Sequence, residues 1–206
     1  MLVIAMPLLV ALASPLDVDA NEGFHEVAVL ELWSVYGHFT DENGRRLGVS
    51  ATFFNGKYLF VSGAGNFVTF SDDEKKASRG DYKLIIPLVS PVSHTADRLE
   101  ERFGDNTLRK TDTGAYRLSM KVGRHRLSLE LKPQKKPLPM GGAGRTEWEG
   151  RRSEGFTVPR LEAVGTADLG EGKARRLKGT ANLMHSWANA MEEDHDLFII
   201  NLDDGT

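Results

Sequence analysis

Glu31 is the first residue of the sequence whose type and surroundings suit proton transfer. It opens the apolar segment 31–54, and because alternate residues of a strand share a face, its carboxyl lies on the side of Trp33. A carboxyl on an apolar face is costly unless it is paired, and burial raises its pKa, so Glu31 is a candidate proton donor. The competing interpretation is a glutamate at a strand end that bonds arginine or water.

His185 is the second candidate acid–base residue, because histidine titrates near neutral pH. It shares one face of the segment 175–187 with Leu183 and Trp187. The competing interpretation is a structural histidine that bonds a backbone carbonyl group.

Large apolar side chains accompany both residues and predict a ligand-binding wall. Trp33 and Phe53 share one face of a hairpin, Met120 lies on the apolar face of another, and Trp187 follows His185 in alternation. Aromatic side chains dominate protein cores, so core packing is the competing interpretation. The functional interpretation is a wall that contacts an apolar or cationic ligand.

The elements that must position these residues are antiparallel hairpins. Folding residues 31–54 about Glu42-Asn43-Gly44 pairs Trp33 with Phe53, and Gly44 can take the left-handed conformation that such a loop requires. Folding residues 116–131 about Gly123-Arg124 pairs Met120 with Leu127 and puts eight large side chains on one face. One buried face and one solvent-exposed face are typical of an antiparallel sheet.

The remaining elements follow from apolar runs and from turn residues. We predict further strands over residues 27–39, 46–54, 58–62, 67–70 and 82–89, and a hairpin from 160–169 and 175–187. Residues 71–79 read as a charged loop and residues 132–144, rich in proline and glycine, as a long surface connection. Residues 94–103 are the one convincing helical stretch.

Composition excludes several functional classes. The net charge of −3 and the dispersed basic residues give no footprint for nucleic acid, and the absence of cysteine excludes thiol catalysis and cysteine-based zinc sites. The acidic run 192–196 lacks the spacing of a calcium loop, so we predict no metal site. No cofactor motif and no membrane-spanning segment are present in the sequence, and we predict a hydrophobic small molecule as partner.

The two ends of the chain carry separate expectations. Residues 1–23 resemble a signal peptide or form an N-terminal extension, which predicts a secreted or periplasmic protein and otherwise a cytoplasmic one. Residues 24–187 are expected to form the barrel, and 188–206 a linker and the first strand of a missing second half. The apolar run 197–202 has no returning strand, so we expect a homodimer or completion by another chain.

Several short motifs occur together. They comprise Glu31, Trp33, Gly37 and His38 within ELWSVYGHF, residues 48–54 (GVSATFF), Pro159-Arg160-Leu161 with Gly165-Thr166, and residues 179–187 (GTANLMHSW). In this order they resemble the hydroxyneurosporene synthase (CrtC)/AttH-like superfamily. The resemblance implies an all-β, antiparallel lipocalin-like (calycin) β-barrel, followed here by the beginning of a second, incomplete half.

The departures from the family pattern bear on function. In the carotenoid 1,2-hydratases of this family, an acidic residue in an Asp-His-Glu-Trp segment is thought to protonate a carbon–carbon double bond. Here Met184 and Ser186 occupy the two acidic positions, and neither can protonate an alkene. We therefore expect a binding or carrier module for an elongated apolar molecule, such as an isoprenoid, polyketide or lipid. The alternative is a cofactor-independent lyase, isomerase or cyclase that uses Glu31 or His185.

Overall fold

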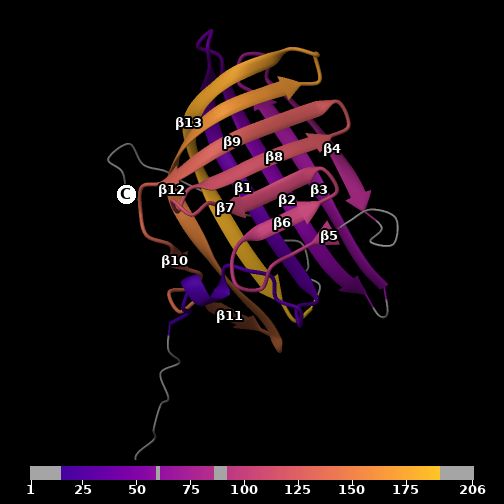
Figure 1. The fold of residues 1–206 in the computed structure, drawn as a ribbon, viewed down its shortest axis with the longest axis vertical. Coiled ribbons are helices and arrows are strands. Elements are labelled where there is room, and N and C mark those ends of the chain that lie inside the picture. Colours follow the sequence, from indigo (N-terminus) through magenta and orange to yellow (C-terminus); the bar gives the residue numbers. More distant parts are fainter. Residues whose placement is uncertain (1–14, 59–60, 86–91, 191–206) are drawn as a thin grey trace, which may run out of the picture.

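The fold is a single antiparallel sheet that curls into a nearly closed barrel. The computed structural model describes residues 15–58, 61–85 and 92–190. The strand order is β4-β3-β2-β1-β13-β12-β9-β8-β7-β6-β5, with β10 and β11 paired to β12, so the one unsealed seam lies between β4 and β5. In Figure 1, β6–β9 lie in front of β1–β3, and the long strands β12 and β13 curve from one layer to the other. The predicted all-β barrel is confirmed.

The strands differ widely in length. Their bounds are β1 Leu30–Asp41, β2 Arg46–Tyr58, β3 Val61–Asp72, β4 Ala77–Ile85, β5 Val92–Ser93, β6 Glu100–Phe103, β7 Asn106–Lys110, β8 Tyr116–Val122, β9 His125–Pro133, β10 Leu138–Pro139, β11 Arg145–Trp148, β12 Arg151–Leu169 and β13 Ala174–Ala188. Within the described residues the only helix is the short 3-10 helix η1 (Asp19–Asn21). No helix in that part of the chain is long and apolar enough to cross a membrane.

Both long hairpins have the register that the sequence predicts. In the β1–β2 pair Trp33 lies opposite Phe53, and in the β8–β9 pair Met120 lies opposite Leu127. Gly44 has a φ of 83° at the first turn. Since the four paired side chains are all buried, the predicted inner wall is confirmed. The hairpin of β12 and β13 also forms, with both strands longer than predicted.

The predicted helix over residues 94–103 is wrong. Glu100–Phe103 form strand β6, which pairs with β7 across a two-residue turn at Gly104-Asp105. Leu99, Glu101 and Phe103 are buried while their neighbours are not, which is the two-residue period of a strand. Pairing with β7 therefore outweighs the local preference of this charged segment for a helix.

Other boundaries also move. Residues 58–62 and 67–70 are not two strands, since Tyr58 ends β2 and Val61–Asp72 form β3 without interruption. The charged loop is shorter than predicted because β4 begins at Ala77. Of the strand expected over 82–89, residues 82–85 are the end of β4, and residues 86–89 lie outside the described residues. The connection over 132–144 contains β10. The expectations for the signal peptide and for the run 197–202 lie outside the described residues.

Ion pairs between arginine and aspartate close the end of the barrel where β1 finishes. Arg175 Nη1 lies 3.1 Å from Asp41 Oδ2, and Arg45 forms an ion pair with Asp72. The Arg45 guanidinium lowers the pKa of Asp72 to about 2. Burial opposes ionisation of Asp41, but hydrogen bonds from the backbone N–H groups of Arg45 and Asn43 and from Arg175 outweigh it and lower its pKa.

Candidate functional site

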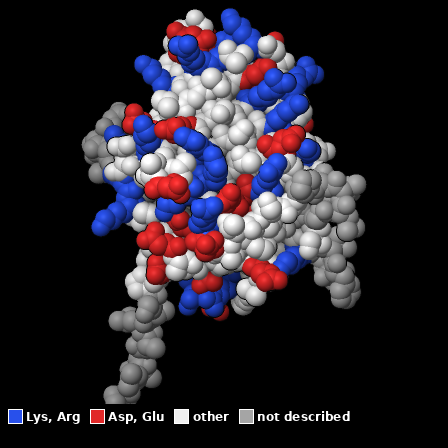
Figure 2. Space-filling view, viewed as in Figure 1, with Lys and Arg blue, Asp and Glu red and all other residues white. Residues whose placement is uncertain are grey.

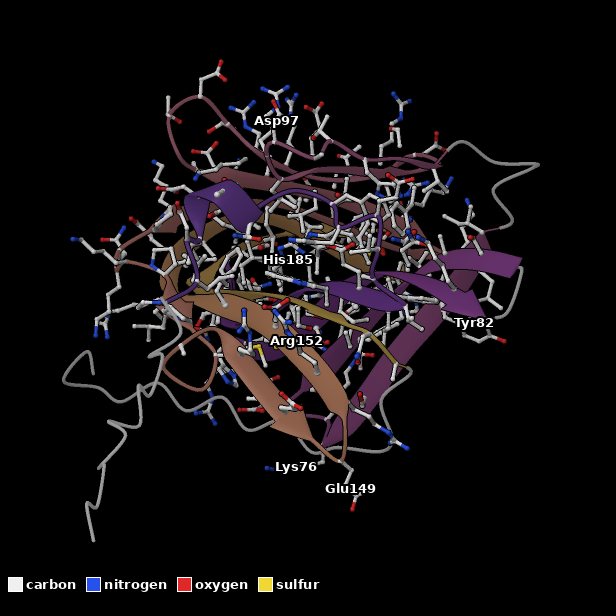
Figure 3. The ribbon with its side chains drawn as sticks, turned by 90° about the horizontal axis from the view of Figure 1, so that it is seen from below. Lys76, Tyr82, Asp97, Glu149, Arg152 and His185 are labelled. Atoms are coloured by element: carbon white, nitrogen blue, oxygen red, sulfur yellow. The ribbon has the colours of Figure 1, made fainter. Side chains whose placement is uncertain are left out.

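Glu31 and His185 meet inside the barrel at the opposite end of β1. The β1–β13 register places Trp33 opposite His185, so that Glu31 is one inward-facing position away. His185 Nε2 lies 2.8 Å from Glu31 Oε1, and both side chains are about 1% exposed. Figure 3 shows His185 between the layers of strands. The structure thus brings together the two residues that the sequence singles out separately.

His25 joins this pair from the segment before β1. Its Nδ1 lies 2.8 Å from Glu31 Oε1, and its backbone N–H donates to Glu31 Oε2 over 3.0 Å. Its Nε2 lies 3.2 Å from the side-chain oxygen of Asn21 in η1. The segment around η1 therefore folds over this end of the barrel and completes the polar cluster of His25, Glu31 and His185.

The hydrogen bonds set the charge of Glu31. Burial alone raises the pKa of this carboxyl, but hydrogen bonds from His185 and from His25 outweigh burial and lower it. The expectation that Glu31 is a buried proton donor with a raised pKa is therefore wrong. Glu31 is a carboxylate at neutral pH, and its role in the cluster is to accept hydrogen bonds.

His185 is the basic member of the pair. Burial lowers its pKa against the opposing effect of Glu31, so its imidazole is neutral at neutral pH. Because Nε2 faces the carboxylate, the hydrogen of the neutral ring belongs on Nε2 and leaves a lone pair on Nδ1. Nδ1 makes no hydrogen bond of ordinary geometry in the described part of the chain, although the ring lies close enough to the backbone of Asn21 for this contact to raise its pKa. The ring is thus oriented to accept a proton.

Aromatic rings surround the cluster. The Trp33 ring stacks on His185 with centroids 5.0 Å apart, and Trp187 stacks on His25 at 3.8 Å. Phe156 meets His185 edge-on at 5.4 Å. The walls of the site are therefore apolar, although Trp187 also donates a hydrogen bond to Glu154.

A second acid–base pair, His94 and Glu101, was missed by sequence reasoning. His94 Nδ1 is hydrogen-bonded to Glu101 Oε2, and the His94 ring stacks on Phe24 at 4.1 Å and on Trp33 at 6.1 Å. Burial, together with the nearby charge of Glu31, raises the pKa of Glu101 to about 10. Burial lowers the pKa of His94. The signal that could have found Glu101 is its alternation with Leu99 and Phe103.

The predicted ligand wall divides into two groups. Trp33 and Trp187 contact the histidines of the cluster directly. Phe53 lies opposite Trp33 and packs edge-on against Phe103 with centroids 5.4 Å apart. Met120 is buried in the same core but takes part in none of the hydrogen bonds of the cluster. The assignment of these residues to ligand binding stays a prediction.

Met184 and Ser186 lie on the other face of β13 from His185. Successive side chains of a strand point to opposite faces, so the two positions where the family pattern has acidic residues face away from the cluster. Both are nevertheless buried. Their replacement does not remove acid–base groups from the interior, because Glu31, His185 and Glu101 come from the inward-facing positions.

A metal ion is an alternative occupant of the cluster. The donor atoms of His25, Glu31 and His185 lie within 4.8 Å of one another, and two histidines with one carboxylate are a known ligand set for iron and zinc. The 2.8 Å N···O separations are ordinary lengths for charge-assisted hydrogen bonds. Hydrogen bonding therefore accounts for the geometry, and chelation provides a direct test.

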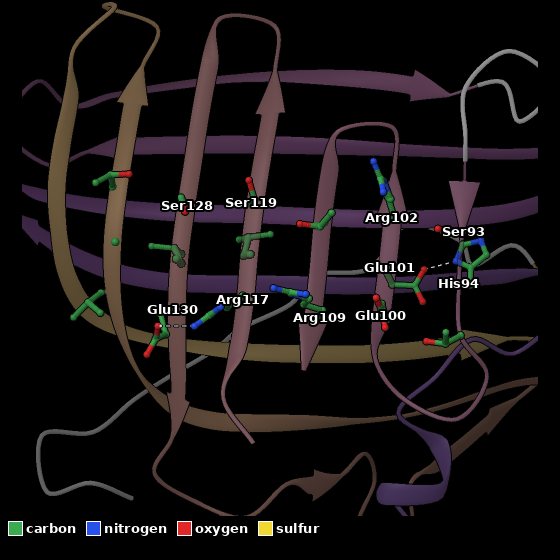
Figure 4. A pocket seen from close by; sticks show the side chains of 17 residues that line it. Ser93, His94, Glu100, Glu101, Arg102, Arg109, Arg117, Ser119, Ser128 and Glu130 are labelled. Atoms are coloured by element: carbon green, nitrogen blue, oxygen red, sulfur yellow. Dashed lines mark hydrogen bonds and ion pairs between the residues drawn. The ribbon is translucent and has the colours of Figure 1, made fainter. Parts of the chain in front are cut away.

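A groove of about 760 Å³ runs along the outer face of β6–β9 and β12. Figure 4 shows polar and charged side chains along it, among them Arg109, Arg117, Ser119 and Glu130. Charged side chains of both signs are interspersed over this face of the molecule (Figure 2). His94 and Glu101 also border the groove, so it approaches the second acid–base pair from outside.

Comparison with known proteins identifies the class of protein that this fold and site define. The sequence matches the AttH-like family over residues 10–206, and the chain belongs to this family. No curated protein matches the sequence significantly.

Two solved structures are similar. A putative AttH protein from Nitrosomonas europaea has a TM-score of 0.76 and 20% identity over 93% of this chain and 60% of its own. Kievitone hydratase from Nectria haematococca has a TM-score of 0.63 and 14% identity over 87% of this chain and 51% of its own. This chain therefore spans 60% and 51% of the lengths of these two proteins, and at such identities the likeness shows the fold alone.

Proposed function

We propose that this protein is an acid–base enzyme of the lyase or isomerase kind, which moves a proton on a small, mostly apolar molecule. The observation that supports this most is the buried 2.8 Å hydrogen bond between Glu31 and His185, with Nδ1 of His185 left without a partner among the described residues. Buried polar atoms normally have partners, so an exception calls for an explanation, and a catalytic role is one such explanation. The similarity to a hydratase is in line with this chemistry.

The proposed mechanism uses Glu31 and His185 as a unit. Glu31 holds the ring through the hydrogen on Nε2, and Nδ1 takes a proton from the substrate. The imidazolium that forms is stabilised by the adjacent carboxylate, as in the carboxylate–histidine pairs of hydrolases. Return of the proton to a different carbon isomerises a double bond. In a lyase reaction the hydroxyl group on the neighbouring carbon instead takes the proton from His185 and leaves as water while the double bond forms, and the reverse of this step is a hydration.

The apolar walls limit the substrate. Trp33, Trp187 and Phe156 surround the histidines and offer ring faces and edges rather than charged groups. The substrate is therefore a molecule with mostly apolar surface, for which an isoprenoid, polyketide or lipid remains the proposal. Stacking against Trp33 and Phe156 suits a planar conjugated portion.

A carrier that binds such a molecule without changing it is the second candidate. It is favoured by the interior packing, since Trp33, Phe53, Phe103 and Phe156 are each fully buried by neighbouring side chains. A carrier needs no free base, so the lone pair on His185 Nδ1 is the feature it leaves unexplained.

The experiment that separates the two candidates measures binding and turnover on the same compounds. The protein is incubated in D₂O with a panel of isoprenoids, polyketides and lipids, and mass spectrometry records bound ligand, uptake of deuterium and gain or loss of water. The enzyme hypothesis predicts product with the wild type, loss of product in H185Q and E31Q, and retained binding. The matched control is H125Q, which changes a buried histidine of β9 outside the cluster. Binding with no change of mass in any compound would contradict the enzyme and support the carrier.

A further inference from the structure

We infer that Glu101 and Trp33 complete the site as a pair of donors that bind a carbonyl oxygen of the substrate, and that Glu101 supplies the proton. This inference rests on the proposed function and adds to it the proton donor and the chemical class of the substrate. The substrate class is an enolisable ketone or a related carbonyl compound with otherwise apolar surface.

Three buried polar atoms without partners lie around one indole ring. They are Nε1 of Trp33 itself, Nδ1 of His185, which stacks on that ring, and Oε1 of Glu101, which is bonded to a histidine that also stacks on it. A ligand beside Trp33 could satisfy all three. The other unpartnered atoms in the described part of the chain belong to Arg45, Asn66, His125 and Arg175.

The three atoms differ in what they offer. The indole Nε1–H can only donate. If His94 donates its Nδ1 hydrogen to Glu101 Oε2, the hydrogen of the neutral carboxyl sits on the unpartnered Oε1 and also donates. His185 Nδ1 accepts. Two donors and one acceptor match a carbonyl oxygen, which accepts two hydrogen bonds, next to a carbon that can lose a hydrogen.

The chemical step balances without a further reactant. His185 Nδ1 removes a proton from the carbon beside the carbonyl, the electron pair of that C–H bond forms a carbon–carbon double bond, and the carbonyl π electrons move to oxygen. Glu101 transfers its proton to that oxygen and becomes a carboxylate. The enol then returns its oxygen proton to Glu101, and His185 returns a proton to carbon. In D₂O the net result is exchange of hydrogen for deuterium at that carbon.

The outer groove passes beside Glu101. His94, Glu101 and Ser93 all border it, and the side chain of His94 is 14% exposed whereas that of Glu101 is fully buried (Figure 4). The groove therefore lies next to the His94–Glu101 pair.

The first test measures binding of two probes that share a skeleton. 1-Tetralone carries an enolisable carbonyl group and tetralin lacks the oxygen, and titration of tryptophan fluorescence or calorimetry gives their affinities. The wild type is expected to favour 1-tetralone by roughly 3- to 10-fold, the contribution of one or two neutral hydrogen bonds. In W33F the calorimetric preference falls, in E101L it is lost, and in E101Q it persists because the amide N–H replaces the carboxyl O–H. Equal affinity of the wild type for both probes would overturn the inference.

The second test measures proton transfer, which separates Glu101 from a residue that only binds. Deuterium uptake by 1-tetralone is followed by mass spectrometry at saturating ligand. E101Q is expected to lower the exchange rate by about 100-fold or more, the usual contribution of a general acid, with little change in affinity. H125Q is the control that leaves the rate unchanged, and circular dichroism checks that every variant is folded.

The outcomes distinguish failure of this inference from failure of the proposed function. If H185Q abolishes exchange while E101Q and W33F exchange as the wild type does, the proposed function stands and the roles of Glu101 and Trp33 are refuted. If the wild type shows no exchange but prefers 1-tetralone, and E101L removes that preference, the protein binds carbonyl compounds and the proposed enzyme is refuted.

Discussion

The buried carboxyl groups near the two ends of β1 have different kinds of partner. At its last residue, Asp41 is bonded to Arg175 and to backbone N–H groups, and nearby Asp72 is paired with Arg45. Near its start, the buried carboxyl of Glu31 is bonded to two histidines. Glu101, which faces the same interior, is paired with a third histidine. Arginine keeps its charge at every pH at which the protein folds, whereas histidine can gain or lose a proton near neutrality.

The difference indicates that the pairs at one end of β1 stabilise the fold, whereas the pairs at the other end have the groups needed for proton transfer. Arginine–aspartate pairs fix a charge pattern and tie turns together, and they cannot take part in proton transfer near neutral pH. The pairs of histidine with glutamate hold one carboxyl charged and the other neutral, because Glu31 accepts three hydrogen bonds while Glu101 is buried beside that charge. Two groups whose environments push their pKa values apart are typical of acid–base sites.

The largest expected effect is the difference in deuterium exchange rate between variants at the two ends of the barrel. H185Q removes the proposed base and should lower deuterium exchange into a substrate by about 100-fold or more, because general bases contribute that much. R175M, at the other end, should leave the rate within about twofold, since Arg175 lies ten residues away along β13. The measurement is the exchange rate of both variants under identical conditions. Equal losses in both would show that the rate reports stability and not the site.

E101Q should stabilise the protein, increasingly so at higher pH. The folded pKa of about 10 lies above the ordinary 4.5, so the folded state keeps a proton that the unfolded chain releases. The wild type therefore loses about 1.4 kcal/mol per pH unit through this interval, which amounts to roughly 3.5 kcal/mol at pH 7. Glutamine carries no such penalty. Urea unfolding between pH 4 and pH 9 gives the difference in unfolding free energy between E101Q and the wild type. If this difference does not grow with pH, Glu101 is ionised in the folded state.

R175M should cost about 2 kcal/mol of unfolding free energy, since it leaves the buried Asp41 carboxylate without its guanidinium partner. This loss of unfolding free energy is smaller than the loss on breaking a fully buried ion pair, because backbone N–H groups still donate hydrogen bonds to Asp41. R46M is the matched control, since Arg46 pairs with Asp73 on the surface and is worth at most about 0.5 kcal/mol. Urea unfolding at neutral pH gives both values, and equal losses would contradict a structural role specific to the Arg175–Asp41 pair.

The smallest expected effect is that of metal removal. If hydrogen bonds alone hold His25, Glu31 and His185 together, dialysis against EDTA should change the exchange rate and the melting temperature by no more than the error of measurement. Elemental analysis of the purified protein accompanies this test. Loss of exchange with EDTA and its recovery with added zinc or iron would replace the proton-transfer pair by a metal site with the same three ligands.

Sequence alone predicted the pairing register of the β1–β2 and β8–β9 hairpins because their signals are local. Alternation fixes which side chains of β1 and β8 face inward, and a glycine at the turn fixes the register, so the Trp33–Phe53 and Met120–Leu127 pairs follow directly. The inward position of Glu31 follows in the same way. That Glu31 and His185 are neighbours depends in addition on β1 pairing with β13, which closes the sheet between distant segments.

The charge state of the site could not be predicted from the sequence, because it depends on contacts between segments with no shared local pattern. His25 lies before β1 in a segment without strand periodicity, and only its fold over the barrel end lowers the pKa of Glu31. For Glu101 the sequence predicts a helix, since Arg98-Leu99-Glu100 and their neighbours have helical propensity. Its burial is decided by the pairing of β6 with β7.

The measurement that tests the central claim most directly is ¹⁵N NMR of the histidine side chains as a function of pH. We expect His185 to be neutral at pH 7 with its hydrogen on Nε2 and its lone pair on Nδ1, and to stay neutral below the ordinary histidine pKa of 6.5. E31Q should remove the preference for that tautomer. A His185 ring that carries its hydrogen on Nδ1, or that is doubly protonated at pH 7, has no free base and would contradict the proposed site.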